Sequence, residues 1–137
     1  MSKFWTVVTI LAITALVFLA VEKQGNEGIS FTDLETECRY DMDKSTSIGL
    51  DGDKITFSGY FQTNSPEANL NYRYTKSGSD IELDIVTSDS MIPDSFYDSC
   101  LASAVYEAET RPLESGEYTV TVYHDGIKQK DVGIRVK

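Results

Sequence analysis

The chain has 137 residues and a formal net charge of −10, with 22 acidic and 12 basic side chains. All of the acidic residues but only 11 of the basic ones follow Val21, so the chain beyond it carries −11. This charge argues against binding to nucleic acid or docking on anionic lipid headgroups, because both would repel the protein.

Residues 4–21 form an uncharged, apolar run that predicts a transmembrane anchor. As a helix the run would span roughly 27 Å, close to the hydrocarbon thickness of a bilayer. Trp5 lies at its edge, where an amphipathic ring favours the interface. Lys3 precedes the run, and positive charge stays inside. We therefore expect residues 1–3 in the cytoplasm, 4–21 in lipid, 22–28 as a linker and 29–137 outside.

A cleaved secretory signal is the main alternative to an uncleaved signal-anchor. Cleavage after Ala20 would place Phe18 where a small residue is expected, and the run exceeds the usual h-region of about 7–15 residues. A buried helix in a soluble protein is the third alternative. The uncleaved signal-anchor and the cleaved signal would both place the remainder of the chain outside the cytoplasm.

Beyond residue 28 the hydrophobic pattern has period two, which is typical of strands. A polar segment at 88–99 containing Pro93 predicts a connection, and Gly59 predicts a bulge or a close backbone approach. Turn signals occur at 76–80 and at Asp125-Gly126, the latter a hairpin signature. About seven strands are expected, at Ile29–Tyr40, Ile55–Phe61, Leu70–Thr75, Ile81–Ile85, Cys100–Thr110, Tyr118–Tyr123 and Val132–Val136.

This spacing of short strands and turns predicts an all-β fold, a single antiparallel immunoglobulin-like β-sandwich. A small closed barrel is the second choice. Cys38 and Cys100 are the only cysteines, and in an exported domain they predict one disulfide. No tryptophan lies between them, so the core is not of the antibody type.

The stretch from Cys100 through 104–108 and 116–126 resembles the C-terminal half of small exported archaeal β-sandwich proteins. That family consists mainly of uncharacterised lipoproteins and membrane-anchored proteins. The chain departs from it by having no lipobox cysteine at the end of its apolar run and by the early position of Cys38. The resemblance implies export and a sandwich fold, and it implies no activity.

An acidic segment offers a possible calcium site. Asp41 and Asp43 begin like a calcium loop, but Thr46 and Gly52 occupy the positions where an EF-hand needs glycine and glutamate. Asp51 and Asp53 could still join them in an irregular, weak site. An acidic turn without metal is the simpler interpretation, and no other cofactor is expected.

No catalytic constellation stands out. His124 beside Asp125 could act as a general base, but a solvated turn residue is the expected role of this histidine. One histidine cannot form a zinc site with cysteines that are disulfide-bonded. Acidic residues gather at 107–117 without sign of a cleft, and the tyrosines Tyr72 and Tyr74 share one strand face that suggests core.

The leading expectation is therefore a non-enzymatic accessory or interaction module, held in lipid through residues 4–21 and in contact with a protein partner. The 88–99 connection and the final strand edge at 132–136 are the expected contact surfaces. An exported binding protein for calcium or a cationic solute is the alternative, and an exported hydrolase comes third.

Overall fold

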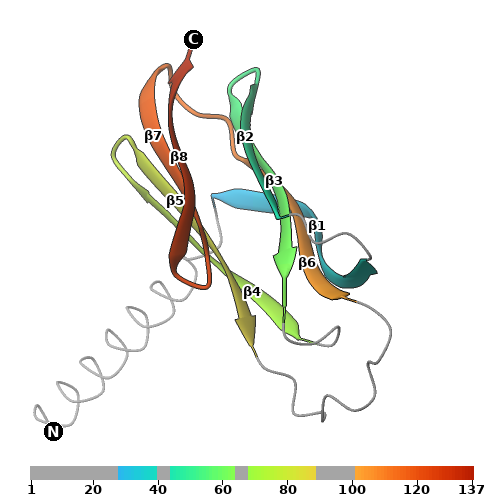
Figure 1. Cartoon of the computed structure of the whole chain (residues 1–137). Coiled ribbons are helices and arrows are strands. Elements are labelled where there is room, and N and C mark those ends of the chain that lie inside the picture. Colours follow the sequence, from blue (N-terminus) through green and yellow to red (C-terminus); the bar gives the residue numbers. More distant parts are fainter. Residues whose placement is uncertain (1–27, 40–43, 64–67, 89–100) are drawn as a thin grey trace, which may run out of the picture.

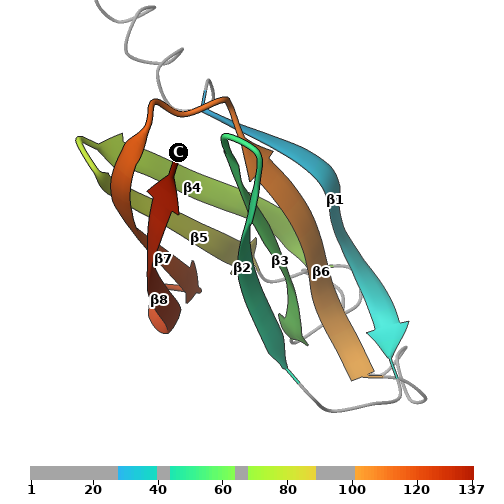
Figure 2. The ribbon, with the colours of Figure 1, turned by 90° about the horizontal axis from the view of Figure 1, so that it is seen from above.

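The computed structural model describes residues 28–39, 44–63, 68–88 and 101–137, which form two four-stranded sheets. The strand order is β1–β6–β3–β2 in the first sheet and β4–β5–β7–β8 in the second. The two sheets face one another (Figures 1 and 2). The strands are β1 (Ile29–Arg39), β2 (Ser45–Asp51), β3 (Lys54–Gln62), β4 (Asn69–Ser77), β5 (Asp80–Ser88), β6 (Leu101–Thr110), β7 (Gly116–His124) and β8 (Ile127–Val136).

The core lies between the sheets and consists of alternate side chains that the central strands turn inward. In β5, for example, Ile81 and Leu83 are fully buried whereas Glu82 between them is exposed. One cluster draws on both layers: Ile29, Ile55, Phe57, Phe61, Ile81, Leu83, Ile85, Ala104, Tyr106, Ala108, Tyr118, Val120, Val122 and Val136. Two sheets around a common core confirm the all-β prediction and have the layout of a β-sandwich.

One strand pair departs from the predicted antiparallel arrangement. β5 and β7 run parallel, in register from Asp80 opposite Thr119 to Ile85 opposite His124, so the prediction was wrong at this pair. Parallel neighbours need a crossover connection, and here β6 supplies it by passing through the opposite sheet. The period-two pattern specifies strands and faces, but it carries no information about which strands become neighbours.

The segment that the sequence suggested to be an acidic turn contains a strand. Ser45–Asp51 forms β2, which pairs with β3 from Ser45 opposite Tyr60 to Asp51 opposite Lys54. β2 is an edge strand with mostly exposed or half-buried side chains, so its composition is polar and its hydrophobic pattern is weak. This strand raises the number in the described part of the chain to eight.

Two turn and glycine predictions can be compared with the backbone. Asp125 and Gly126 have φ angles of 50° and 76°, which confirms a tight hairpin turn with two left-handed positions between β7 and β8. Gly59 marks a close approach: a Cβ there would lie 2.5 Å from the Ser45 carbonyl oxygen and 2.5 Å from the Tyr106 hydroxyl. Neither ladder that includes Gly59 shifts register there, so it is not a bulge.

Several expectations fall on residues outside the described part. Residues 4–21, most of the 88–99 connection, Asp41, Asp43 and Cys100 all belong to this group. Within the described residues, no helix is long and apolar enough to cross a bilayer. The described parts hold no free cysteine, and Cys38 lies in β1 opposite Ala102 of β6. The anchor and the Cys38–Cys100 bond stay predictions.

Candidate functional site

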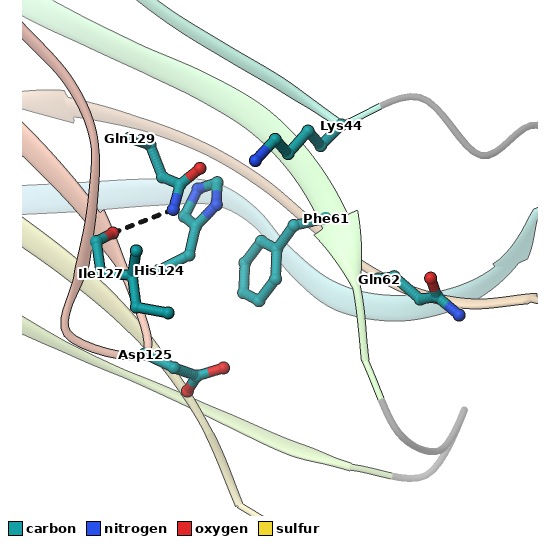
Figure 3. A pocket seen from close by; sticks show the side chains of 7 residues that line it. All are labelled: Lys44, Phe61, Gln62, His124, Asp125, Ile127 and Gln129. Atoms are coloured by element: carbon teal, nitrogen blue, oxygen red, sulfur yellow. Dashed lines mark hydrogen bonds between the residues drawn. The ribbon is translucent and has the colours of Figure 1, made fainter.

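An open hollow lies beside the turn of the β7–β8 hairpin (Figure 3). Its volume is about 740 Å³, within the range of small-molecule sites. Both sheets contribute to it, because the end of β3 and the residue preceding β2 face the hairpin across the gap. The lining residues are Lys44, Phe61, Gln62, His124, Asp125, Ile127 and Gln129.

His124 forms the inner wall of this hollow. The prediction that this histidine is a solvated turn residue was wrong. Only 5% of His124 is exposed. The residue ends β7 at an inward position, continuing the series Tyr118, Val120 and Val122. The same alternation is visible in the sequence, so extending the period by one step would have placed the imidazole in the core. The Asp-Gly signature obscured this signal, since a residue before a turn is readily taken as exposed.

The imidazole is held by aromatic side chains of the opposite sheet. Its ring stacks on Phe61 with the ring centroids 4.0 Å apart and the planes 16° from parallel. The Tyr106 hydroxyl lies 2.9 Å from Nε2 of His124. Burial lowers the pKa of His124 from 6.5 to about 4, the negative charge of Asp125 opposes this shift, and the positive charge of Lys44 adds to it to a smaller extent. The ring is therefore neutral at physiological pH.

The hydrogen bonds around Tyr106 indicate which ring nitrogen carries the proton. Burial raises the pKa of Tyr106 to about 12, although the Thr46 side chain acts in the opposite direction, so the phenol keeps its proton. A neutral imidazole nitrogen is a stronger acceptor than a phenol oxygen, so we infer that Tyr106 donates to Nε2 of His124. We assign the proton of the neutral imidazole to Nδ1 on this basis.

Two donors at the hollow have no acceptor in the described part of the chain. Nδ1 of His124 is one, since the ring's hydrogen bond is made through Nε2. The ammonium group of Lys44 forms no salt bridge with any described residue and is the second. The Asp125 carboxylate, by contrast, accepts from the backbone N–H and the hydroxyl of Thr87, at 2.7 and 2.8 Å. Lys44 and Asp125 lie on opposite sides of the hollow (Figure 3).

A second polar group supports the hairpin from the outer face of the sheet. Asp84 of β5 is 8% exposed, and it accepts from Arg73 at 2.6 Å and from the Gly126 N–H at 3.1 Å. The Asp125 N–H donates to the Ile85 carbonyl at 2.9 Å. These bonds hold the left-handed turn against β5 and thereby fix the rim of the hollow.

The proposed calcium ligands are only partly described. Asp51 and Asp53 are exposed at the turn between β2 and β3, and no group of three or more metal-binding side chains occurs in the described residues. Asp41 and Asp43 lie outside the described residues, and β2 (Ser45–Asp51) extends over roughly 20 Å before it reaches Asp51. Calcium binds its oxygen ligands at about 2.4 Å. The calcium site shared by the four carboxylates stays a prediction.

The acidic residues at 107–117 do not gather around a cleft. Glu109 forms a 2.7 Å salt bridge with Lys54 on the first sheet, and Glu117 pairs with Arg135 on the second. The side chains of Tyr72 and Tyr74 are half-buried against the core cluster, as expected. None of these residues lines the hollow.

No family model, no curated protein and no solved structure matches this chain. The resemblance to exported archaeal sandwich proteins stays a prediction.

Proposed function

We propose that the chain is a single-pass membrane protein whose extracytoplasmic β-sandwich serves as a non-enzymatic accessory or interaction module of a surface or membrane assembly. The apolar run at 4–21 and the preceding Lys3 support the anchor and its orientation. The acidic composition of the remainder suits a solvated domain that is kept away from anionic lipid. An immunoglobulin-like arrangement is part of the proposal at the level of two packed sheets, with the parallel β5–β7 pair as a departure.

The observation that carries the interaction role is the edge position of β8. This strand has ten residues, and in the described part of the chain only β7 pairs with it. Backbone donors and acceptors along the outer edge of such a strand can pair with an added strand of another protein. Among the basic side chains of β8, Lys128 lies 4.0 Å from Asp131 and Arg135 pairs with Glu117. Lys130 forms no salt bridge with a described residue and donates only to the Thr46 carbonyl, at 3.5 Å, so it is the charge of β8 that a partner can use. An acidic extended segment is the partner that this edge suits.

The environment of the histidine supports a role without catalysis. His124 is the only histidine of the chain, and its Nε2 is engaged by Tyr106 in the core. A general base needs a reachable nucleophile or water and a pKa close to the working pH. A ring with a pKa of about 4 is a weak base at neutral pH.

We also propose a Cys38–Cys100 disulfide, which would link β1 to the residue that precedes β6 in the sequence. The register pairs Arg39 with Leu101, and Cys100 directly precedes Leu101 in the chain. This proximity supports a bond between the two sulfur atoms. Such a bond would fit the oxidising compartment that the anchor implies.

Topology and partner contact can be tested together in native membranes. A membrane-impermeant maleimide should label a Ser115→Cys variant in sealed cells, because Ser115 is an exposed position between β6 and β7. A photo-crosslinking residue at Gly133 of β8, an exposed position where a Cβ meets no atom within 4 Å, should give a discrete adduct that a Lys130→Glu variant loses. The matched control places the same residue at Thr75 of β4, at the opposite edge of the sheet. Labelling only after lysis would contradict export, and equal adducts from both edges would contradict a β8 interface.

A further inference from the structure

The hollow beside His124 is the feature that none of the roles above uses. Its inner wall is a buried imidazole whose Nδ1–H lacks an acceptor in the described part of the chain. Because the hollow is open, water can accept this hydrogen bond, and a ligand oxygen in the hollow would take the place of that water.

The charged side chains at the hollow indicate which kind of ligand would replace that water. Lys44 contributes an ammonium group without a salt bridge to any described residue. The Asp125 carboxylate lies on the opposite side and already accepts two hydrogen bonds from Thr87. An oxygen anion near Lys44 would therefore accept from both Lys44 and His124, and such charge-assisted hydrogen bonds are the stronger kind.

The remaining surface of the hollow is partly apolar. Phe61 stacks beneath the imidazole, and Ile127 is the more exposed of the two large hydrophobic side chains that project from the described surface, at 68%. Gln62 and Gln129 complete the rim, and the Gln129 amide donates to the Ile127 carbonyl at 3.0 Å. A ligand with an apolar body would cover Ile127 and remove it from water.

We propose that this hollow binds a small organic carboxylate. One carboxylate oxygen accepts from Nδ1–H of His124, and the other pairs with Nζ of Lys44. The apolar body of the ligand lies on Phe61 and Ile127. This binding site is separate from the β8 edge and does not depend on the proposed protein interface.

The single histidine makes the test direct. The full-length chain, labelled with ¹⁵N-histidine, carrying no histidine tag and held in zwitterionic lipid nanodiscs, gives one imidazole signal pair by NMR. Titration with hexanoate should shift this pair saturably while the proton stays on Nδ1. Hexanol has the same apolar body without the charge and should give no saturable shift.

Lysine variants identify the contact. Lys44→Gln should weaken hexanoate binding at least about tenfold, the effect of losing a charged hydrogen bond. Lys137→Gln makes the same charge change at the far end of β8 and should leave binding unchanged. Lys44 is exposed and precedes β2, so its replacement should not disturb folding, and the His124 signal reports the fold in each variant.

Three results would overturn the proposal. The first is no saturable shift up to about 50 mM hexanoate, well above the range of a millimolar ligand. The second is an equal response to hexanol, which would mean that partition into the apolar surface or the lipid causes the shift. The third is a proton on Nε2, which would turn a lone pair toward the hollow instead of a donor.

Discussion

The hydroxyl of Tyr106 in β6 lies 2.9 Å from Nε2 of His124 in β7, so a hydrogen bond crosses the core and joins the two sheets. Both residues are buried, and the bond is shielded from water. A directional bond inside a largely apolar core fixes how one sheet sits on the other. The same bond orients the imidazole at the hollow.

Tyr106→Phe should lower the free energy of unfolding by about 1–3 kcal/mol, because it leaves Nε2 of His124 buried without a partner. Denaturant unfolding of the full chain measures the change. Tyr118→Phe is the matched control: its hydroxyl donates to the Glu114 carbonyl at 2.9 Å in a less buried place. Its loss should cost about 1 kcal/mol or less. Equal losses in the two variants would contradict a special role for the Tyr106–His124 bond.

Stability should fall as the pH is lowered from about 6.5 to 4. Burial lowers the pKa of His124 to about 4 in the folded chain, whereas the unfolded chain has the ordinary value of 6.5. The unfolded state therefore binds more protons in this range, so protonation favours unfolding. The contribution of His124 is complete above pH 6.5, and its loss amounts to about 3 kcal/mol by pH 4.

His124→Gln isolates this effect, because glutamine does not titrate. Its stability should be nearly flat between pH 6.5 and 5, a range above most carboxylate pKa values. Urea midpoints at several pH values provide the measurement. A wild-type profile as flat as that of His124→Gln would show that the imidazole is not buried in a neutral form.

Gly126→Ala should destabilise the chain by about 1 kcal/mol through its backbone alone. The φ angle of Gly126 is 76°, and a Cβ there would meet no atom within 4 Å. Gly133→Ala is the control: a Cβ there also meets nothing, and Gly133 is not in the left-handed region. Thermal melting should show a lower Tm for the first variant and an equal or higher Tm for the second.

Gly59→Ala should lower the stability of the protein more than Gly49→Ala, the other glycine-to-alanine change in β2 and β3. The new Cβ would lie 2.5 Å from the Ser45 carbonyl oxygen, which is backbone and cannot move without disturbing the β2–β3 ladder. We expect a loss of about 3 kcal/mol or more. Gly49→Ala on the neighbouring strand meets only the end of the Thr56 side chain, at 2.8 Å, and should cost about 1 kcal/mol or less. Similar unfolding midpoints for the two variants would argue against the close approach at Gly59.

The proposed Cys38–Cys100 bond should contribute about 4 kcal/mol, because it would close a loop of roughly 60 residues. Mass spectrometry of the unreduced chain after proteolysis should find the two cysteine peptides linked. Cys38→Ser, Cys100→Ser and the double variant should lose the same stability, since each removes the same bond. Additive losses would mean that the cysteines act separately.

The strands of the core could be predicted because burial on one face imposes a period of two. The β4–β5 hairpin and the Asp125-Gly126 turn follow from the same local chemistry. β2 escaped prediction because an edge strand with few buried side chains carries little of that period. The parallel β5–β7 pair escaped because strand order depends on contacts between segments distant in the chain.

By itself the sequence determined which residues form the inner faces of the central strands, where the hairpins turn and how acidic the domain is. Those properties depend on neighbouring residues and on composition. Tertiary structure alone decided that His124 meets Tyr106 and Phe61, and that Lys44 lies at the same hollow. These residues come from both sheets and distant parts of the chain, so only the packing of one layer on the other brings their side chains together.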